Sequence, residues 1–194
     1  MTFGKTKIYD MKKKDEIPVI EPKDILIGKA DAPFTLIEFV DYESEESEKV
    51  HATVKKVMEH FKGKINYNFR HFPQMRIHQR AHKAAEAAVA AAQEGKFYEM
   101  HEMLLKNRRH LGTISLNSYA KEVGIKNKSY LANLIDGKYG WTVQDDIRTG
   151  LDLGIKNAPA FFINGEKLEG HVTEKSLTEF INHAIRKRKV RNAA

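Results

Sequence analysis

The segment that decides the fold reads Phe34-Thr35-Leu36-Ile37-Glu38-Phe39-Val40 and continues into Asp41-Tyr42-Glu43-Ser44. A short run in which nearly every residue is apolar or β-branched is typical of a strand buried on both faces. Apolar residues then recur at helical spacing over residues 50–61, and Gly63 ends that helix. Residues 65–69 alternate as a strand does. The order strand, helix, strand predicts a βαβ unit with parallel strands.

The chain on either side of this unit predicts further elements. Residues 24–28 form a candidate edge strand, and the apolar pattern is wholly helical over about residues 77–138. A further helix is predicted over residues 141–153. Residues 160–163 then have the pattern of a buried strand, and Asn164-Gly165 predicts a tight hairpin, because both positions tolerate a positive φ. The apolar positions of a closing amphipathic helix are Leu177, Phe180, Ile181, Ala184 and Ile185.

Length and composition predict one folded domain. The chain has 194 residues, of which 41% are hydrophobic, enough to bury one core. We expect the domain to span residues 24–188, with its helical insertion at about 77–138, a polar extension at 1–23 and a basic tail at 189–194. No apolar run approaches the roughly 18 residues of a membrane span, and no apolar stretch typical of a signal peptide is evident. As written, the sequence predicts a cytoplasmic protein without a membrane span.

The formal net charge of +7 bears on possible partners. No aromatic residues interleave with the basic clusters at the two ends, so we expect solvated termini and no nucleic-acid site. Oligomeric state stays open. The basic residues that gather at the ends are Lys12, Lys13, Lys14, Arg186, Lys187, Arg188, Lys189 and Arg191.

Five segments form a pattern that is specific in order and spacing. They are Glu38-Phe39-Val40-Asp41-Tyr42, Phe69-Arg70-His71-Phe72-Pro73, Ala84-Ala85-Glu86-Ala87-Ala88, Gly95-Lys96-Phe97-Tyr98-Glu99-Met100-His101 and Ala158-Pro159-Ala160-Phe161-Phe162-Ile163-Asn164-Gly165. This pattern resembles the DsbA-like branch of the thioredoxin superfamily from about Ile25 to Ile185. The resemblance implies an α/β thioredoxin-like fold with a helical insertion. The activity of that family is thiol–disulfide exchange.

The redox motif of that family is absent from this chain. Where the family carries Cys-x-x-Cys, the matching positions are Ser44-Glu45-Glu46-Ser47, and the chain has no cysteine anywhere. A serine hydroxyl does not form a disulfide, so the family reaction is excluded. Ser44 fits a helix N-cap, and Glu45 and Glu46 complement the helix dipole.

Acidic residues crowd this turn, six of them within eleven positions and no base among them. We expect them to oppose a thiolate by like-charge repulsion. A cysteine restored at position 44 should therefore have a pKa close to or above the free value of about 8.5. The acids are Glu38, Asp41, Glu43, Glu45, Glu46 and Glu48.

Pro159 matches the cis-proline of the family, with Ala158 before it. The resemblance implies a cis peptide bond here, and backbone groups that pair with an extended substrate segment, which needs no cysteine. We predict a redox-inactive domain that binds a peptide or protein through Ala158 and Pro159 and needs no cofactor. Two alternatives stay open. One is an enzyme similar to kappa-class glutathione transferases, in which Ser44 would hold the glutathione thiolate. The other is an oxidoreductase disarmed by Cys-to-Ser substitution.

Histidines offer the remaining candidates for chemistry. His78 and His82 are four residues apart in a predicted helical region, which is a metal-ligand spacing. No Glu-x-x-His context accompanies them, so capping or surface histidines are favoured and no metal site is predicted. The acids over residues 41–48 lack the loop spacing of a dedicated calcium site. We expect His101 at a helix surface or core edge, and Trp141 in the core.

Overall fold

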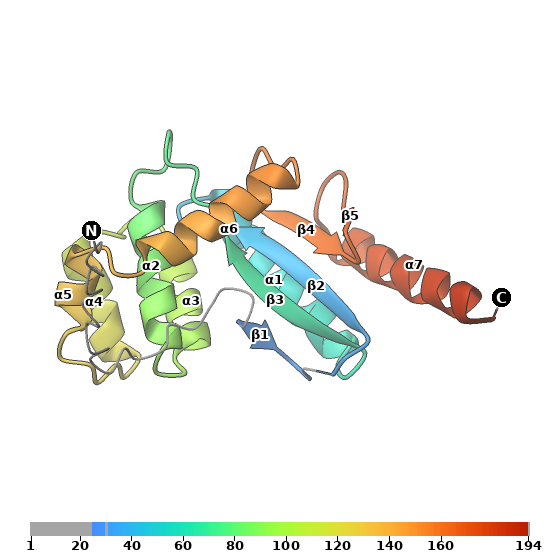
Figure 1. Ribbon diagram of the computed structural model, residues 1–194, viewed down its shortest axis with the longest axis horizontal. Coiled ribbons are helices and arrows are strands. Elements are labelled where there is room, and N and C mark those ends of the chain that lie inside the picture. The colour runs from blue at the N-terminus through green and yellow to red at the C-terminus, as the bar shows by residue number, and fades with distance from the viewer. Residues whose placement is uncertain (1–24, 30, 194) are drawn as a thin grey trace, which may run out of the picture.

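A five-stranded mixed sheet with helices on both faces organises the computed structural model, which describes residues 25–29 and 31–193 (Figure 1). The expected extension at residues 1–23 lies outside the described residues. The sheet has the order β1-β3-β2-β4-β5, in which only β2 and β3 pair in parallel. The strands are β1 (Leu26–Ile27), β2 (Phe34–Val40), β3 (Ile65–His71), β4 (Ala160–Ile163) and β5 (Glu166–Lys167).

The central position of β2 follows from its sequence. It pairs in parallel with β3, with Phe34 opposite Ile65, and antiparallel with β4, with Phe39 opposite Ala160. Strands that are paired on both sides need apolar side chains on both faces. The predicted hairpin between β4 and β5 is present, and Asn164 and Gly165 both have positive φ angles, of 51° and 80°.

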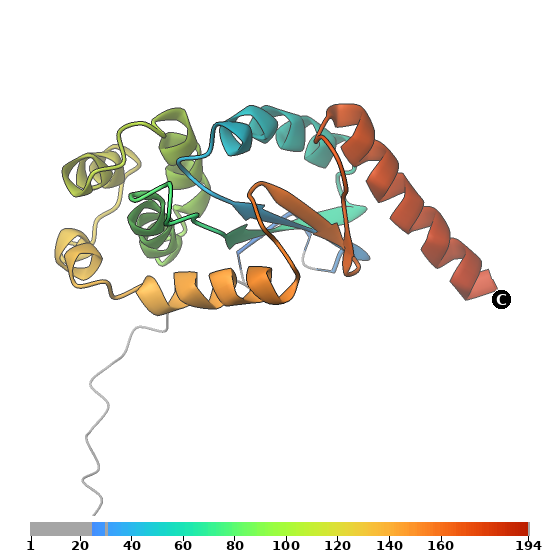
Figure 2. The same ribbon diagram turned by 90° about the horizontal axis from the view of Figure 1, so that it is seen from above.

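Within the described part of the chain, seven helices cover the sheet and build the insertion. Figure 2 shows α1 on one face of the sheet and α6 on the other, while α2 to α5 gather beyond one end. The closing helix α7 packs beside α1 and continues to Ala193, through most of the range where a basic tail was expected. The helices are α1 (Glu45–His60), α2 (Ala81–Ala92), α3 (Phe97–Lys106), α4 (Thr113–Glu122), α5 (Tyr130–Ile135), α6 (Gly140–Asp152) and α7 (Glu174–Ala193).

The prediction that Trp141, on helix α6, lies in the core is wrong. Trp141 is 79% exposed and does not lie in the core. The buried face of α6 includes Val143, Ile147 and Gly150. Trp141 precedes Val143 by two positions, about 200° around the helix, and so faces away from the core. None of the described helices is both long and apolar enough to cross a membrane.

Candidate functional site

The turn between β2 and α1 is closed by two serines. Ser44 is the N-cap of α1, with an extended backbone, and its Oγ accepts a hydrogen bond from the Ser47 amide at 3.3 Å. The Ser47 Oγ accepts from the Asp41 amide at 3.4 Å. Both side chains are buried, Ser44 with 7% of its surface exposed. The first bond satisfies an amide that a helix start leaves without an intrahelical partner, and the second ties α1 to the residue that follows β2.

The Pro159 loop lies directly against this turn. Because β4 runs antiparallel to β2, residues just before β4 are placed beside the end of β2. The Ala158–Pro159 peptide bond is cis, and the Ser44 hydroxyl donates to the Ala158 carbonyl oxygen at 3.4 Å. The structure thus brings the matching positions of the family site together. The Ser44 hydrogen is already used in that bond, so the geometry gives no support to the glutathione-transferase-like alternative.

The acids closest to the turn have structural partners. Asp41 is fully buried, and its carboxylate accepts from the amides of Glu43 and Gln74 and contacts His78 Nδ1 at 2.8 Å. The Glu43 carboxylate accepts from the amides of Arg80 and Ala81, where α2 begins. These two carboxylates therefore tie the turn to the helical insertion.

The outer acids are paired with bases that lie elsewhere in the chain or one turn along α1. Arg108 contacts Glu45 at 3.3 Å and Glu48 at 2.5 Å, and Lys49 contacts Glu45 at 2.8 Å and Glu46 at 3.4 Å. The hydrogen bond from Lys49, followed by the charges of Lys49 and Arg108, lowers the pKa of Glu45. No base lies among these acids in the sequence, but the fold brings Arg108 and Lys49 against three of them. Arg108 follows Glu45 by 63 positions, so local sequence does not reveal the pairing.

Behind the turn lies a buried carboxyl group, the first of the six acids within residues 38–48. Glu38 on β2 is 3% exposed, and the hydroxyl of Tyr67 on β3 donates a hydrogen bond to it. Burial raises the pKa of Glu38 to about 8, against the smaller lowering effect of that hydrogen bond. Glu38 is therefore mostly a neutral carboxylic acid at neutral pH.

Two histidines are buried as well, and the rings of both lie near Tyr42. His101 does not lie at the surface or core edge as expected, because α3 turns it inward with Phe97 and Leu104. Its Nδ1 pairs with the Tyr42 hydroxyl and its Nε2 with His51 Nδ1, each at 3.2 Å. Burial holds the pKa of His101 well below its usual value.

His71, at the end of β3, is fully buried, and neither ring nitrogen has a hydrogen-bond partner among the described residues. Its ring lies among aromatic rings, with centroids 5.1 Å from Phe69 and 5.9 Å from Tyr42. Burial lowers the pKa of His71 to about 3, so the side chain is neutral at neutral pH. The sequence around His71 did not predict that its ring would be buried without hydrogen-bond partners in the described part of the chain.

His78 and His82, the two histidines considered for a metal site, contact different carboxylates. His78 contacts Asp41, whereas His82 contacts Glu86 at 3.2 Å. Within residues 25–29 and 31–193, no group of three or more histidine, aspartate or glutamate side chains is arranged to hold a metal ion.

The surface around Pro159 has both apolar and polar features. Gln74 donates from its side-chain amide to the Asn157 side chain at 2.9 Å, which joins the loop after β3 to the Pro159 loop. The next residues of the first loop include Met75 and Ile77, which are 49% and 68% exposed. A hollow of about 360 Å³ is lined by Pro159 together with Lys167 and Leu168. We call Met75, Ile77, Asn157 and Pro159 the Pro159 surface.

Sheet order, the insertion between β3 and β4, and the hydrogen bond from Ser44 to the carbonyl oxygen of Ala158 define a DsbA-like thioredoxin fold without cysteines. The family model described as Thioredoxin matches residues 21–183, and the chain belongs to the thioredoxin family. BdbD from Bacillus subtilis superposes with a TM-score of 0.75 at 23% identity, covering 86% of this chain and 93% of that one. The thiol-disulfide exchange protein alpha-DsbA2 from Wolbachia pipientis superposes with a TM-score of 0.70 at 21% identity, covering 82% and 86%.

Curated relatives correct the expected location. The chain is 30% identical over 170 residues to a Na⁺/H⁺ antiporter, NhaA 1, from Salinispora arenicola. The match covers 87% of this chain but 26% of the antiporter, so the chain spans about a quarter of that relative's length. The expectation of a cytoplasmic protein is wrong, because the matching relatives are named as antiporters, which are membrane proteins.

Proposed function

We propose that this domain binds extended peptide segments at the Pro159 surface and performs no thiol–disulfide exchange. The observation that carries the proposal is the exposure of Met75 and Ile77 on a loop that Gln74 joins to the Pro159 loop. Large apolar side chains that are exposed on a loop bonded to the family's binding loop favour an interaction surface. The chain contains no sulfur nucleophile, which supports binding without redox turnover.

The chemistry of the surface favours a peptide with apolar side chains. Met75 can adapt its unbranched side chain to different partners. Arg76 and Lys156 are exposed nearby, so their charges would face the rim of a bound segment. The hollow beside Pro159 provides space for one side chain of the peptide. Main-chain pairing at this loop needs no cysteine, and it accepts many sequences.

Binding of an unfolded client without thiols tests the proposal. Reduced and carboxymethylated α-lactalbumin stays unfolded, and its blocked cysteines exclude disulfide trapping. Fluorescence anisotropy of the labelled client should show saturable binding to the full chain. Ile77→Glu should weaken this binding about tenfold, equivalent to about 1.4 kcal/mol, by placing a charge in the apolar contact.

Ile114→Glu provides the matched control, because Ile114 is 88% exposed on α4, outside the Pro159 surface. Its affinity for the client should equal that of the unaltered chain. Absence of binding to the unaltered chain, or an equal loss in both variants, would contradict the proposal.

A further inference from the structure

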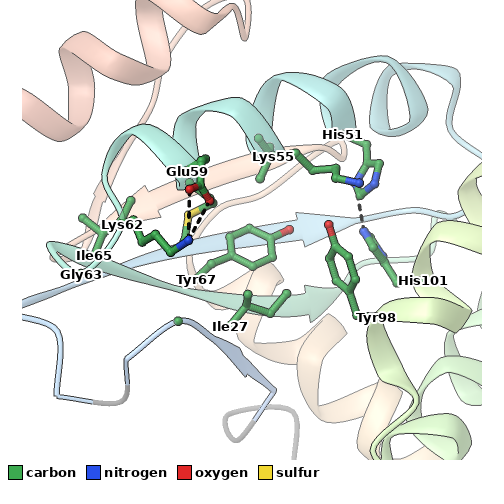
Figure 3. A pocket seen from close by; sticks show the side chains of 13 residues that line it. Ile27, His51, Lys55, Glu59, Lys62, Gly63, Ile65, Tyr67, Tyr98 and His101 are labelled. Atoms are coloured by element: carbon green, nitrogen blue, oxygen red, sulfur yellow. Dashed lines mark hydrogen bonds and ion pairs between the residues drawn. The ribbon is translucent and has the colours of Figure 1, made fainter.

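A second cavity, of about 360 Å³, lies between α1, α3 and the strands β1 and β3 (Figure 3). Its apolar lining includes Ile27 from β1, Ile65 from β3, and Val54 and Met58 from α1. The Tyr67 ring lies in the middle of the view. The sheet order places β3 and β2 between β1 and β4, so this cavity is separate from the Pro159 surface.

The charged groups around this cavity are paired with one another. Lys62 contacts Glu59 at 3.1 Å at one end, and Lys55 contacts Glu102 at 2.5 Å at the other. Burial lowers the pKa of His51, whose ring is therefore mostly neutral at neutral pH. An ionic ligand would lose hydration here without meeting an unpaired charge of opposite sign.

Most polar atoms in the walls of the cavity already have hydrogen-bond partners within the protein. The Tyr67 hydroxyl donates to Glu38, and both nitrogens of His101 contact other side chains. One end of the cavity keeps polar groups, because His51 Nε2 and Lys55 Nζ both lie near the partly exposed Glu102 carboxylate, at 3.6 Å and 2.5 Å. An apolar cavity with a few polar groups at one end is the usual form of a small-molecule site.

We propose that this cavity binds a small, uncharged and largely apolar molecule that presents one polar group toward His51, Lys55 and Glu102. The apolar body of the ligand would contact Val54, Met58 and Ile65. The flexible Met58 side chain allows the cavity to adjust to the shape of the ligand. A ligand that replaces the contact between Lys55 and Glu102 at the rim of the cavity loses little free energy, because exposed ion pairs contribute only about 0–1 kcal/mol.

Two fluorescent probes with related ring systems separate this proposal from general apolar binding. N-phenyl-1-naphthylamine is uncharged, whereas 1-anilinonaphthalene-8-sulfonate adds a sulfonate to the same framework. The uncharged probe should bind the full chain saturably with increased emission, and the sulfonate should bind at least tenfold more weakly. Lack of saturable binding by the uncharged probe, or equal affinity of the two probes, would overturn the proposal.

Two substitutions of the same type locate the bound probe. Met58→Trp fills the cavity and should weaken binding of the uncharged probe at least tenfold. Met75→Trp makes the same change on the Pro159 surface and should leave the affinity unchanged. The opposite result would place the probe on the Pro159 surface and overturn the proposal.

Amide chemical shifts of the unaltered chain test the same site if Met58→Trp does not fold. Titration with the uncharged probe should move the amides of Ile27, Val54 and Tyr98 and leave those of Met75 and Ile77 in place. Shifts confined to any other surface would overturn the proposal. Client binding at the Pro159 surface is measured separately, so either proposal can fail alone.

Discussion

The two sides of the β2 end differ in how their polar groups are used. On the outer side, Ser44 caps α1, Ser47 accepts from the Asp41 amide, and the nearby carboxylates contact amides or cations. On the inner side, Glu38, His71 and His101 are buried, with pKa values shifted far from the usual range. Residues 44–47, which match the Cys-x-x-Cys motif of the family, thus form the start of a helix. The ionisable groups with strongly shifted pKa values lie behind them. Substitutions on the two sides should therefore differ in size and in pH dependence.

The largest expected effect comes from Glu38. Because its pKa is about 8 in the folded protein and near 4.5 when unfolded, the folded state holds more protons between these values. The free energy of unfolding should therefore fall as pH rises from about 4.5 to about 8, by up to about 1.4 kcal/mol per pH unit. Glu38→Gln should remove this dependence, giving a difference of several kcal/mol in urea unfolding across the range.

Glu46→Gln is the control for this experiment, because Glu46 is exposed in the first turn of α1. Its unfolding free energy should differ from that of the unaltered chain by no more than about 1 kcal/mol at any pH, because its helix-dipole and ion-pair contacts are exposed. A Glu38→Gln variant with an unchanged pH profile would show that Glu38 is ionised in the folded protein.

His71 should give the next largest effect, with the opposite pH dependence. Its pKa of about 3 lies below the ordinary value of 6.5, so the unfolded chain binds more protons between these values. Stability should fall as pH decreases below about 6.5. His71→Leu should make this acid loss less steep and raise the unfolding free energy at neutral pH by about 1–3 kcal/mol, because it removes two unpartnered buried nitrogens.

Urea unfolding at neutral and mildly acidic pH measures both effects. His183→Leu, at an exposed position on α7, should leave the acid profile unchanged. Destabilisation by His71→Leu at neutral pH would mean that the imidazole makes a favourable contact in the folded protein.

The pKa of a cysteine restored at position 44 tests how charge is balanced on the outer side of the β2 end. In Ser44→Cys/Ser47→Cys, the start of α1 favours a thiolate, and Arg108 and Lys49 neutralise much of the nearby acidic charge. We expect a pKa for the first cysteine about one unit below the free value of about 8.5. This reverses the expectation from sequence. Titration of thiolate absorbance measures the pKa, and adding Arg108→Gln should raise it. A pKa at or above the free value would mean that the acids control the turn.

The smallest effect should come from the cap itself. Ser44→Ala removes the bonds to the Ser47 amide and to the Ala158 carbonyl oxygen. Loss of an N-cap side chain costs about 1 kcal/mol. Urea unfolding should show this loss at every pH, whereas Ser118→Ala, at an exposed position on α4, should change stability by less than about 0.5 kcal/mol. A loss that varied strongly with pH would contradict a purely capping role.

Local sequence predicted the elements that depend on local rules. The strands over residues 34–40 and 160–163 were predicted with the observed bounds, because apolar runs next to turn residues mark buried strands. The N-cap at Ser44 and the hairpin at Asn164-Gly165 also follow from short-range chemistry. The resemblance to DsbA-like proteins placed Pro159 beside that cap.

Features that depend on distant contacts were missed. Arg108 reaches the start of α1 from a loop about 60 residues later, and His101 is buried because α3 packs beside α1. The exposure of Trp141 depends on which face of α6 meets the domain. Likewise, nothing in the sequence distinguished Met75 and Ile77 as exposed residues beside Pro159. Such properties arise from tertiary packing, and the pattern within one element does not contain them.

The most direct test of peptide binding is an amide chemical-shift titration of the full chain with a cysteine-free, unfolded polypeptide rich in apolar residues. Peptide binding at the Pro159 surface predicts saturable shifts over residues 75–77 and 156–159, with the amides of Ser118 and Ile114 unchanged. Shifts confined to the cavity around Val54 and Met58, or no saturable shift at all, would contradict it.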